Sequence, residues 1–299
     1  MRVTVTGAGG LIGSRLVELL RARGDQVTIL SRSPHAGATA WNPLAEPAPA
    51  GALDGVDAVV HLAGEPIAQR WRPAVREAIR TSRTVGTANL VAGIAAAAEP
   101  PRVLVSASAV GYYGNRGAER LTEESAPGSD FLAEVCVEWE RAAFAARELG
   151  LRVGVLRTGV VLDRHGGALA KMLPPFQLGV GGPVAGGRQY VSWISLGDLA
   201  TLYVAALDDA RYDGPFNATA PAPVTNAELS RALGRALHRP AVLPVPAAAL
   251  QLLYGEMAQI VTDSQNAVPA RALELGHRFE HAALEDALSA ALRRGDGVS

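Results

Sequence analysis

The first thirty residues alternate between short apolar runs and one amphipathic segment. Residues 2–6 (RVTVT) and 26–31 (QVTILS) are apolar and rich in β-branched residues, which predicts two short buried strands. Residues 14–24 (SRLVELLRARG) repeat apolar side chains at helical spacing, which predicts a helix that ends at Gly24. Residues 7–13 are rich in glycine and predict a turn, so the order is strand, turn, helix, strand.

The same alternation continues to about residue 160. Three further strands and two helical patterns are predicted, over residues 57–64, 102–108 and 151–159, and over residues 73–98 and 131–149. Strands that alternate with helices predict a parallel sheet covered by helices on both faces. We therefore expect an α/β fold with a doubly wound parallel sheet.

The pattern changes after residue 160. Residues 181–187 (GGPVAGG) predict a flexible loop, residues 195–207 a helix, and residues 214–218 (GPFNA) a short strand. Most of the remaining sequence has helical spacing, interrupted by prolines. This pattern of helical segments and prolines predicts a smaller, mostly helical C-terminal lobe.

Composition narrows the class of protein. The 299 residues are enough for one large domain with a smaller lobe, and 48 % of them are apolar, so a sizeable core can be buried. The formal net charge of −1 argues against a nucleic-acid partner, which would usually require a basic excess. Cys136 is the only cysteine, so the chain has no intramolecular disulfide and no cysteine-based zinc site, and we expect no metal.

The location of the protein is predicted from its apolar segments. Residues 1–10 lead into a strand and a glycine turn, without the long apolar segment of a signal peptide. The apolar stretch 90–98 is too short to cross a bilayer, which takes about 20 residues. We expect a cytoplasmic protein that does not contact a membrane.

Three glycines mark a candidate nucleotide site. Gly7, Gly10 and Gly13 lie between the first strand and the first helix, with Leu11 and Ile12 inside the motif. Glycine permits a tight turn and a close approach of backbone to a pyrophosphate, and the helix N-terminus offers N–H groups to the anion. The context predicts a dinucleotide-binding Rossmann fold; an ordinary glycine-rich turn in a flavodoxin-like fold is the alternative.

The end of the second strand predicts which dinucleotide binds. A site for NAD usually places an acid there, about 20 residues after the glycines, to bind the ribose 2′-hydroxyl. This chain has Ser31 and Arg32 instead, and a guanidinium suits a 2′-phosphate, so the expected cofactor is NADP(H). A solvated loop arginine is the alternative interpretation of Arg32.

Residues 61–64 (HLAG) end the next predicted strand, at the edge where open α/β sheets bind ligands. Leu62, Ala63 and Gly64 could let the backbone pack against the adenosine side of a cofactor. His61 is interpreted as a satisfied core or loop histidine rather than a catalyst.

The segments TGAGGLIG, DAVVHLAG, VSASAVGYYG and LRTGVVL together resemble the extended short-chain dehydrogenase/reductases. Longer matches narrow the resemblance to an atypical subgroup, the NAD-dependent epimerase/dehydratase group; they lie at residues 70–87, 105–114, 130–140, 166–200 and 266–279. The resemblance covers nearly the whole chain, including a C-terminal segment of unknown function from about residue 250.

The resemblance implies a domain division. An NADP-binding Rossmann domain would span residues 1–163, and residues 195–207 and 214–218 would return to it. A substrate lobe would span residues 164–299. It also implies cofactor contacts: Ser31 and Arg32 at the adenosine phosphate, Leu62 and Ala63 along the nucleotide, Arg83 at a phosphate, and Val160 near the nicotinamide. The chain departs from the subgroup at Ser195, where a histidine is common.

The usual acid/base pair of this enzyme class, Tyr-x-x-x-Lys, is absent. Lys171 is the only lysine, and the position four residues before it is Gly167. The resemblance implies that this loss is a trait of the subgroup. Any proton transfer must therefore involve other residues.

Three residues are candidates for the chemistry. Ser108 ends a strand and matches the serine that polarises a substrate carbonyl in extended members, although it could simply close the strand. Tyr113 could supply a phenol, although the equivalent tyrosine in relatives is structural. Glu134 could transfer a proton if burial raised its pKa, but Glu134 and Glu138 also fit a solvated acidic helix face, which we favour.

A basic and aromatic group of residues flanks the loop 181–187 and could close over an anionic substrate; ordinary loop packing is the alternative. Its members are Arg157, Lys171, Arg188, Tyr190 and Trp193. The sequence thus predicts an NADP(H)-dependent oxidoreductase acting on a small carbonyl substrate. The alternatives are a sugar-nucleotide epimerase or dehydratase, and a non-enzymatic NADP(H)-responsive protein; a homodimer is compatible with either.

Overall fold

Seven parallel strands form one sheet in the computed structural model, which describes residues 1–33 and 37–293. Their order is β11-β7-β5-β4-β1-β2-β3. The bounds are β1 (Arg2–Thr6), β2 (Gln26–Ser31), β3 (Ala38–Ala40), β4 (Ala58–His61), β5 (Val103–Ala109), β7 (Arg152–Thr158) and β11 (Gly214–Ala218). The chain runs outward from β1 through β2 to β3, then returns to β4 on the other side of β1. Such a reversal opens a crevice at the carboxyl ends of β1 and β4.

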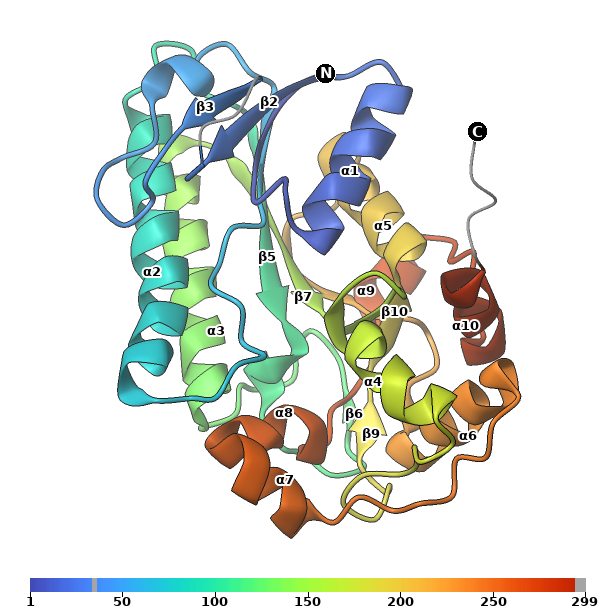
Figure 1. The fold of residues 1–299 in the computed structure, drawn as a ribbon. Helices are drawn as coiled ribbons and strands as arrows, with labels where there is room; N and C mark the ends of the chain where they lie inside the picture. Colours follow the sequence, from blue (N-terminus) through green and yellow to red (C-terminus); the bar gives the residue numbers. More distant parts are fainter. Residues whose placement is uncertain (34–36, 294–299) are drawn as a thin grey trace.

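Helices cover both faces of this sheet (Figure 1). On one face α1 (Leu11–Ala22) packs beside α5 (Leu196–Asp208), and their apolar side chains share a core with β1, β4 and β11. On the other face α2 (Pro73–Ala95) packs beside α3 (Phe131–Phe144) over β4, β5 and β7. The central strands are buried on both sides, which explains why their sequences are continuously apolar.

The C-terminal part is mostly helical. It contains α4 (Gly167–Gln177), α6 (Asn226–Leu237), α7 (Ala247–Tyr254), α8 (Gln259–Thr262), α9 (Ala270–Glu274) and α10 (Leu284–Leu292). Short strands pair in two-stranded sheets separate from the large sheet, β8 with β10, β9 with β12 and β6 with β13; their bounds are β6 (Arg120–Leu121), β8 (Val160–Leu162), β9 (Tyr190–Val191), β10 (Trp193–Ser195), β12 (Val224–Thr225) and β13 (Asn266–Ala267). A separate core, centred on the fully buried Trp193, joins α4, α6 and α10.

The predicted fold class is confirmed. The strands at 26–31 and 214–218 have the bounds that the sequence predicted, and Asp130 caps α3 by accepting hydrogen bonds from Leu132 N at 2.9 Å and Ala133 N at 3.0 Å. The predicted helix over 131–149 is shorter, because its last turn is the 3-10 helix η3 (Ala145–Leu149). The two-residue strands were not predicted, since so short a run carries no periodicity. Within the described residues, no helix is long and apolar enough to cross a membrane.

Candidate functional site

The turn between β1 and α1 packs directly against the loop that follows β4. Gly7 has a φ of +71°, in the left-handed region that favours glycine. A Cβ atom on Gly7 would lie 2.7 Å from the carbonyl carbon of Leu62 and 2.8 Å from the nitrogen of Ala63. A Cβ atom on Gly13 would collide with the carbonyl oxygen of Gly7. The turn can therefore close only with glycine at both positions.

The N-terminus of α1 points its first N–H groups at this crevice. Gly10 caps the helix in extended conformation, and its carbonyl accepts a hydrogen bond from Ser14 N at 2.9 Å. The N–H groups of Leu11, Ile12 and Gly13 come before the first intrahelical bond, so they are available to an anion at the positive end of the helix dipole. This geometry fits the pyrophosphate of a dinucleotide.

Arg32 follows β2, the strand next to β1. It is exposed, whereas Ser31 is half-buried and accepts a hydrogen bond on Oγ from Ser33 N at 3.2 Å. A guanidinium at this strand end lies beside the glycine turn, where an adenosine ribose would fit. The next residues, 34–36, lie outside the described part of the chain.

His61 is a core histidine, as the sequence interpretation held. It is fully buried, with Nδ1 2.7 Å from Thr6 Oγ1 and Nε2 3.0 Å from Thr87 Oγ1. Burial lowers its pKa to about 4, so the ring is neutral near pH 7. Thr6 Oγ1 also accepts a hydrogen bond from Leu62 N at 3.2 Å. His61 therefore fixes the loop after β4 rather than acting on a ligand.

Arg83 reaches this loop from α2. Its Nη1 donates to the carbonyl oxygens of Glu65 at 3.0 Å and Ile79 at 3.1 Å. A Cβ atom on Gly64 would lie 3.3 Å from the guanidinium carbon. The structure thus brings the glycine turn, the loop at 62–64 and Arg83 to one edge of the sheet; their contacts with a cofactor stay predictions.

Val160 lies on the segment that borders the same crevice. It begins β8, and its nitrogen donates to the carbonyl of Ser192 at 2.7 Å. After β8 the chain reaches Gly166, where a Cβ atom would lie 3.2 Å from the side chain of Leu11 on α1. Val160 itself is half-buried. Its predicted contact with a nicotinamide stays a prediction.

Ser108 donates its hydroxyl proton to a buried ion pair. Its Oγ lies 2.7 Å from Oε1 of Glu140 on α3. Glu140 accepts two more hydrogen bonds from Arg157 on β7, from Nε and from Nη2, both at 2.8 Å. Burial acts to lower the pKa of Arg157, but its hydrogen bonds and ion pair with Glu140 outweigh this effect and raise the pKa. The catalytic role of Ser108 stays a prediction.

Tyr113 is fully buried in the 3-10 helix η2 (Val110–Tyr113). Its hydroxyl lies 2.7 Å from Asn217 Oδ1 and 3.0 Å from the carbonyl of Thr122, and it accepts a hydrogen bond from Arg157 Nη1 at 3.0 Å. Burial raises its pKa to about 12. This geometry favours the structural interpretation of the phenol over the catalytic one, which stays a prediction.

The structure does not bring Glu134 to the crevice. Its Oε2 lies 3.2 Å from Nη2 of Arg80 on α2, its side chain is 57 % exposed, and Glu138 binds the same guanidinium. The two carboxylates therefore face α2 and solvent, which is the acidic helix face that we favoured. A role for Glu134 as an acid or base stays a prediction without support from this geometry.

The face of α3 that does meet the sheet edge carries Leu132, Cys136 and Glu140. A Cβ atom on Gly111 would lie 3.5 Å from Cβ of Leu132. Burial, aided by the charge of Glu140, raises the pKa of the Cys136 thiol to about 12, so the thiol is uncharged near pH 7. Sequence analysis missed this face. The feature that could have revealed it is Glu140, a charged residue four positions after Cys136 on an otherwise apolar helix face.

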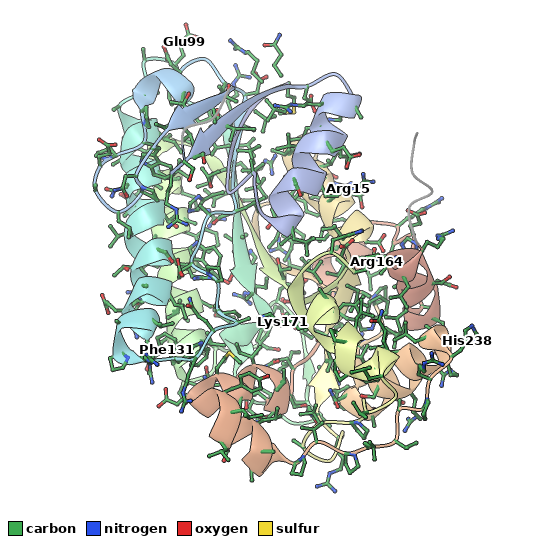
Figure 2. All side chains as sticks on the ribbon, viewed as in Figure 1. Arg15, Glu99, Phe131, Arg164, Lys171 and His238 are labelled. Carbon is green, nitrogen blue, oxygen red and sulfur yellow. The ribbon has the colours of Figure 1, made fainter. Side chains whose placement is uncertain are left out.

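The predicted substrate-binding group around the loop 181–187 is only partly present. Arg157 is buried against Glu140, and Trp193 is a core side chain whose Nε1 donates to the carbonyl of Ala222 at 3.0 Å, so the prediction was wrong for both. Lys171 is exposed on α4 and its Nζ donates at 2.9 Å to the carbonyl of Ala68, in the loop after β4 (Figure 2).

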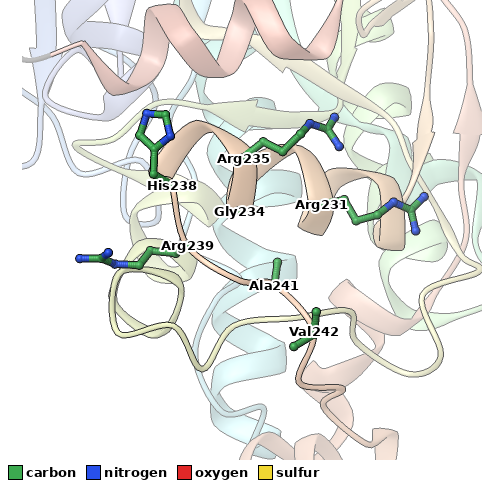
Figure 3. A pocket seen from close by; sticks show the side chains of 7 residues that line it. All are labelled: Arg231, Gly234, Arg235, His238, Arg239, Ala241 and Val242. Atoms are coloured by element: carbon green, nitrogen blue, oxygen red, sulfur yellow. The ribbon is translucent and has the colours of Figure 1, made fainter.

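A second concave region lies on the outer side of α6 (Figure 3). It encloses about 620 Å³, and its lining is Arg231, Gly234, Arg235, His238, Arg239, Ala241 and Val242. The basic side chains point in different directions, Arg235 pairs with Glu285 at 2.8 Å, and Arg239 donates to the carbonyl of Gln177. None of the lining residues comes from the strand ends of the large sheet. Among residues 1–33 and 37–293, no cluster of three or more metal-ligating side chains occurs.

Comparison with known families gives two matches. Residues 3–218 match the NAD dependent epimerase/dehydratase family, and residues 245–291 match a domain of unknown function (DUF1731). An Arabidopsis thaliana protein described as an epimerase family protein SDR39U1 homolog, chloroplastic, is 43 % identical over 303 residues, which cover 98 % of this chain and 87 % of the relative.

Two solved structures have folds similar to that of this chain. The human epimerase family protein SDR39U1, crystallised with NADPH, is 37 % identical, with a TM-score of 0.90 over 97 % of this chain and 99 % of that one. A nucleoside-diphosphate sugar epimerase from Corynebacterium glutamicum is 38 % identical, with a TM-score of 0.80 over 98 % of this chain and 58 % of that one.

Proposed function

The chain belongs to the NAD dependent epimerase/dehydratase family, and from this premise we propose that it binds NADP(H). The observation that carries the proposal is the glycine turn together with Arg32. The turn leaves room for a pyrophosphate at the N-terminus of α1, and Arg32 follows the adjacent strand where a 2′-phosphate would lie. The NADPH in the human relative supports the same cofactor.

We further propose that the reaction is hydride transfer between NADP(H) and a small carbonyl substrate. Hydride transfer depends mainly on orientation of the nicotinamide against one carbon atom, so it does not require the Tyr-x-x-x-Lys pair. Ser108 would polarise the carbonyl oxygen with its hydroxyl. The proton would come from the substrate or from water. Residues 1–163 would hold the cofactor, and residues 164–299 would cover the substrate.

The predicted location and assembly stay predictions. The plant relative is described as chloroplastic, so the family is not confined to the cytoplasm. A homodimer is compatible with the chain.

The cofactor assignment is tested by Arg32→Asp. The carboxylate repels a 2′-phosphate and suits a 2′-hydroxyl, so NADPH affinity should fall by about tenfold or more while NADH affinity holds or rises. Fluorescence titration of the purified protein with each cofactor measures both. Arg211→Gln is the control, because Arg211 is exposed and pairs with Asp209 after α5. Equal losses of NADPH and NADH affinity would contradict the 2′-phosphate assignment.

A second candidate function is NADP(H) binding without turnover. It is favoured by the burial of Tyr113 and by the hydrogen bond that the Ser108 hydroxyl donates to Glu140. Incubation with NADPH and a panel of aldehydes, ketones, quinones and nucleotide sugars separates the two candidates. Oxidation of NADPH by any member supports the reductase, and tight binding without oxidation across the panel supports the binding protein. Sugar epimerisation is less favoured, because it must remove a proton from a hydroxyl and the usual base is absent.

A further inference from the structure

Lys171 links the C-terminal part of the chain to the loop that follows β4. Its helix, α4, buries one face in the core around Trp193, so α4 belongs to the C-terminal part. Its ammonium nevertheless donates a hydrogen bond at 2.9 Å to the carbonyl of Ala68, in the loop between β4 and α2 (Figure 2). The lysine side chain therefore reaches from one part of the molecule to the other.

The first turn of α4 approaches both walls of the crevice. The helix begins at Gly167, where a Cβ atom would lie 3.5 Å from the side chain of Leu11, the first residue of α1. Lys171 follows four residues later, about 6 Å along an α-helix, and contacts the loop after β4. β4 pairs in parallel with β5, so this loop and Ser108 leave the sheet at the same edge. Lys171 is thus placed beside the glycine turn and the candidate catalytic serine.

The ammonium keeps hydrogen-bonding capacity for a ligand. Of its three N–H groups, one donates to the carbonyl of Ala68, a neutral acceptor. Within residues 1–33 and 37–293, no carboxylate oxygen lies within 4.0 Å of Nζ. The hydrogen bond to Ala68 also holds a flexible side chain in one place, which reduces the entropy that is lost when a ligand binds. Lys171 is therefore a positioned cation with donors to spare.

The charges around Lys171 favour an anionic ligand. The loop at residues 64–72 and helix α4 together contain three cations, Lys171, Arg70 and Arg72, and one carboxylate, that of Glu65. The three cations are exposed. An excess of one sign beside a crevice raises the local concentration of ligands of the opposite sign.

We propose that the substrate is an anionic carbonyl compound and that Lys171 binds its carboxylate or phosphate group. The inference rests on the proposed function, because the carbonyl of the same molecule has to lie against Ser108. A lysine ammonium is a compact point charge that suits either group. The anion takes the N–H groups that Ala68 leaves free. In this arrangement the sheet edge holds the cofactor, and α4 selects the substrate by its charge.

Lys171→Met tests the proposal in protein saturated with NADP⁺, so that the cofactor already occupies the glycine turn. Oxamate and inorganic phosphate are the carboxylate and phosphate probes, and ethyl oxamate is the neutral counterpart of oxamate. Calorimetric titration of the wild type should show saturable binding of at least one anion with a Kd of about 10 mM or below, and none of the ester. Lys171→Met should weaken that binding by about tenfold or more, because a charge-assisted hydrogen bond is lost. The anion that binds distinguishes a carboxylate substrate from a phosphate substrate.

Two further variants are the controls. Lys171→Arg keeps the charge and should retain most of the anion affinity, which a purely steric role would not predict. Arg164→Met is the matched control, because Arg164 also donates to a carbonyl, that of Leu292 at 3.2 Å, but within the C-terminal part (Figure 2). It should leave the anion and NADPH affinities unchanged.

The alternative is that Lys171 only braces the loop through Ala68. In that case Lys171→Met lowers the melting temperature and leaves anion affinity unchanged, which overturns the proposal. Failure of both anions to bind the wild type overturns it equally. A loss of NADPH affinity in Lys171→Met of about tenfold would assign the ammonium to the cofactor and contradict the substrate class. A wild type that binds no NADP(H) overturns the proposed function, and this inference with it.

Discussion

Hydrogen bonds link the side chains of Ser108, Glu140 and Arg157, although nothing in the sequence relates these three residues. Oε1 of Glu140 accepts from both Ser108 and Arg157, and Oε2 accepts from Arg157 alone. All three residues are buried, and Arg157 is bound further by Nη1, which donates to the Tyr113 hydroxyl and to the carbonyl of Glu123. The hydroxyl of Ser108 can still accept or exchange a hydrogen bond at the strand end. Its catalytic role therefore depends on whether a substrate reaches it.

Ser108→Ala separates these roles. If the hydroxyl polarises a carbonyl, kcat for carbonyl reduction should fall by about a hundredfold, with NADPH affinity unchanged. The lost hydrogen bond to a charged group should also lower the free energy of unfolding by about 1–3 kcal/mol. Turnover and urea unfolding measure the two effects.

Ser106→Ala is the control for this experiment. Ser106 lies two residues earlier on the same face of β5, and its hydroxyl donates to the carbonyl of Ala107. It should keep full turnover. Wild-type turnover in Ser108→Ala would show that Ser108 is a structural residue that satisfies Glu140.

At the scale of elements, the turn between β1 and α1 can pack closely because two of its positions carry no side chain. Gly7 and Gly13 approach each other and the loop after β4 so closely that no Cβ atom fits. Gly9, in the same turn, has open space around the position of a Cβ atom. The motif spacing singled out Gly7, Gly10 and Gly13, and the packing adds that a Cβ atom is excluded at Gly7 and Gly13.

Gly13→Ala should therefore destabilise the protein even without a cofactor. The added methyl group would collide with the carbonyl oxygen of Gly7, so α1 or the turn must shift, at a cost of about 1–3 kcal/mol in the free energy of unfolding. Urea unfolding of the cofactor-free protein measures the loss. Gly9→Ala should unfold at the wild-type urea concentration. Equal stability of the two variants would contradict the close packing of the turn.

Helix α3 shows that the local sequence predicts where a helix begins but not which of its charged residues are buried. Its start at Phe131 and its cap at Asp130 follow from local sequence, because a cap bonds the backbone two and three residues away. Which acidic residue is buried depends on the neighbours. Glu134 and Glu138 meet Arg80 from α2, while Glu140 meets Arg157 from β7. The spacing in the sequence drew attention to Glu134 and Glu138 as a pair. In the structure, however, the acidic residue that α3 buries against the sheet is Glu140.

At the scale of the whole molecule, the C-terminal segment is attached to the Rossmann sheet by hydrogen bonds. β13 pairs with β6 in parallel, and the Nδ2 atom of Asn217 on β11 donates to the carbonyl of Val268 at 2.9 Å. Ser192 donates to the carbonyl of Gln265 at 2.8 Å and accepts from Ala267 N at 2.8 Å. The hydrogen bonds of Asn217 and Ser192 join residues 51 to 75 positions apart, and β6 and β13 are farther apart still, so the segment 263–268 belongs to the same folded unit as the sheet.

This junction predicts a pH dependence of stability. Burial, with the charge of Asp130, raises the pKa of Asp263 from 3.8 to about 6. The folded protein holds this proton more tightly than the unfolded chain, so Asp263 reduces stability progressively as pH rises from about 4 to about 6. Asp263→Asn removes the ionisation. Its melting temperature should match the wild type near pH 4 and exceed it at pH 7.

Thermal unfolding at several pH values between 4 and 8 tests this expectation. Glu274→Gln is the control, because Glu274 is exposed and its variant should follow the wild type throughout. A difference between Asp263→Asn and the wild type that is constant with pH would contradict a raised pKa at Asp263.

The sequence by itself determined the order of strands and helices and the glycine turn, and it carries the prediction that Arg32 binds a 2′-phosphate. These features are local: a strand, a turn or a cap depends on residues a few positions apart, and the alternation of elements limits the topology. The tertiary structure decided which charges are paired. Arg157 and Glu140 are 17 residues apart and meet only because β7 lies under α3, whereas Arg83, on α2, donates to backbone carbonyls of Glu65 and Ile79. Pairing of buried charges depends on the packing of distant elements, and no local pattern contains it.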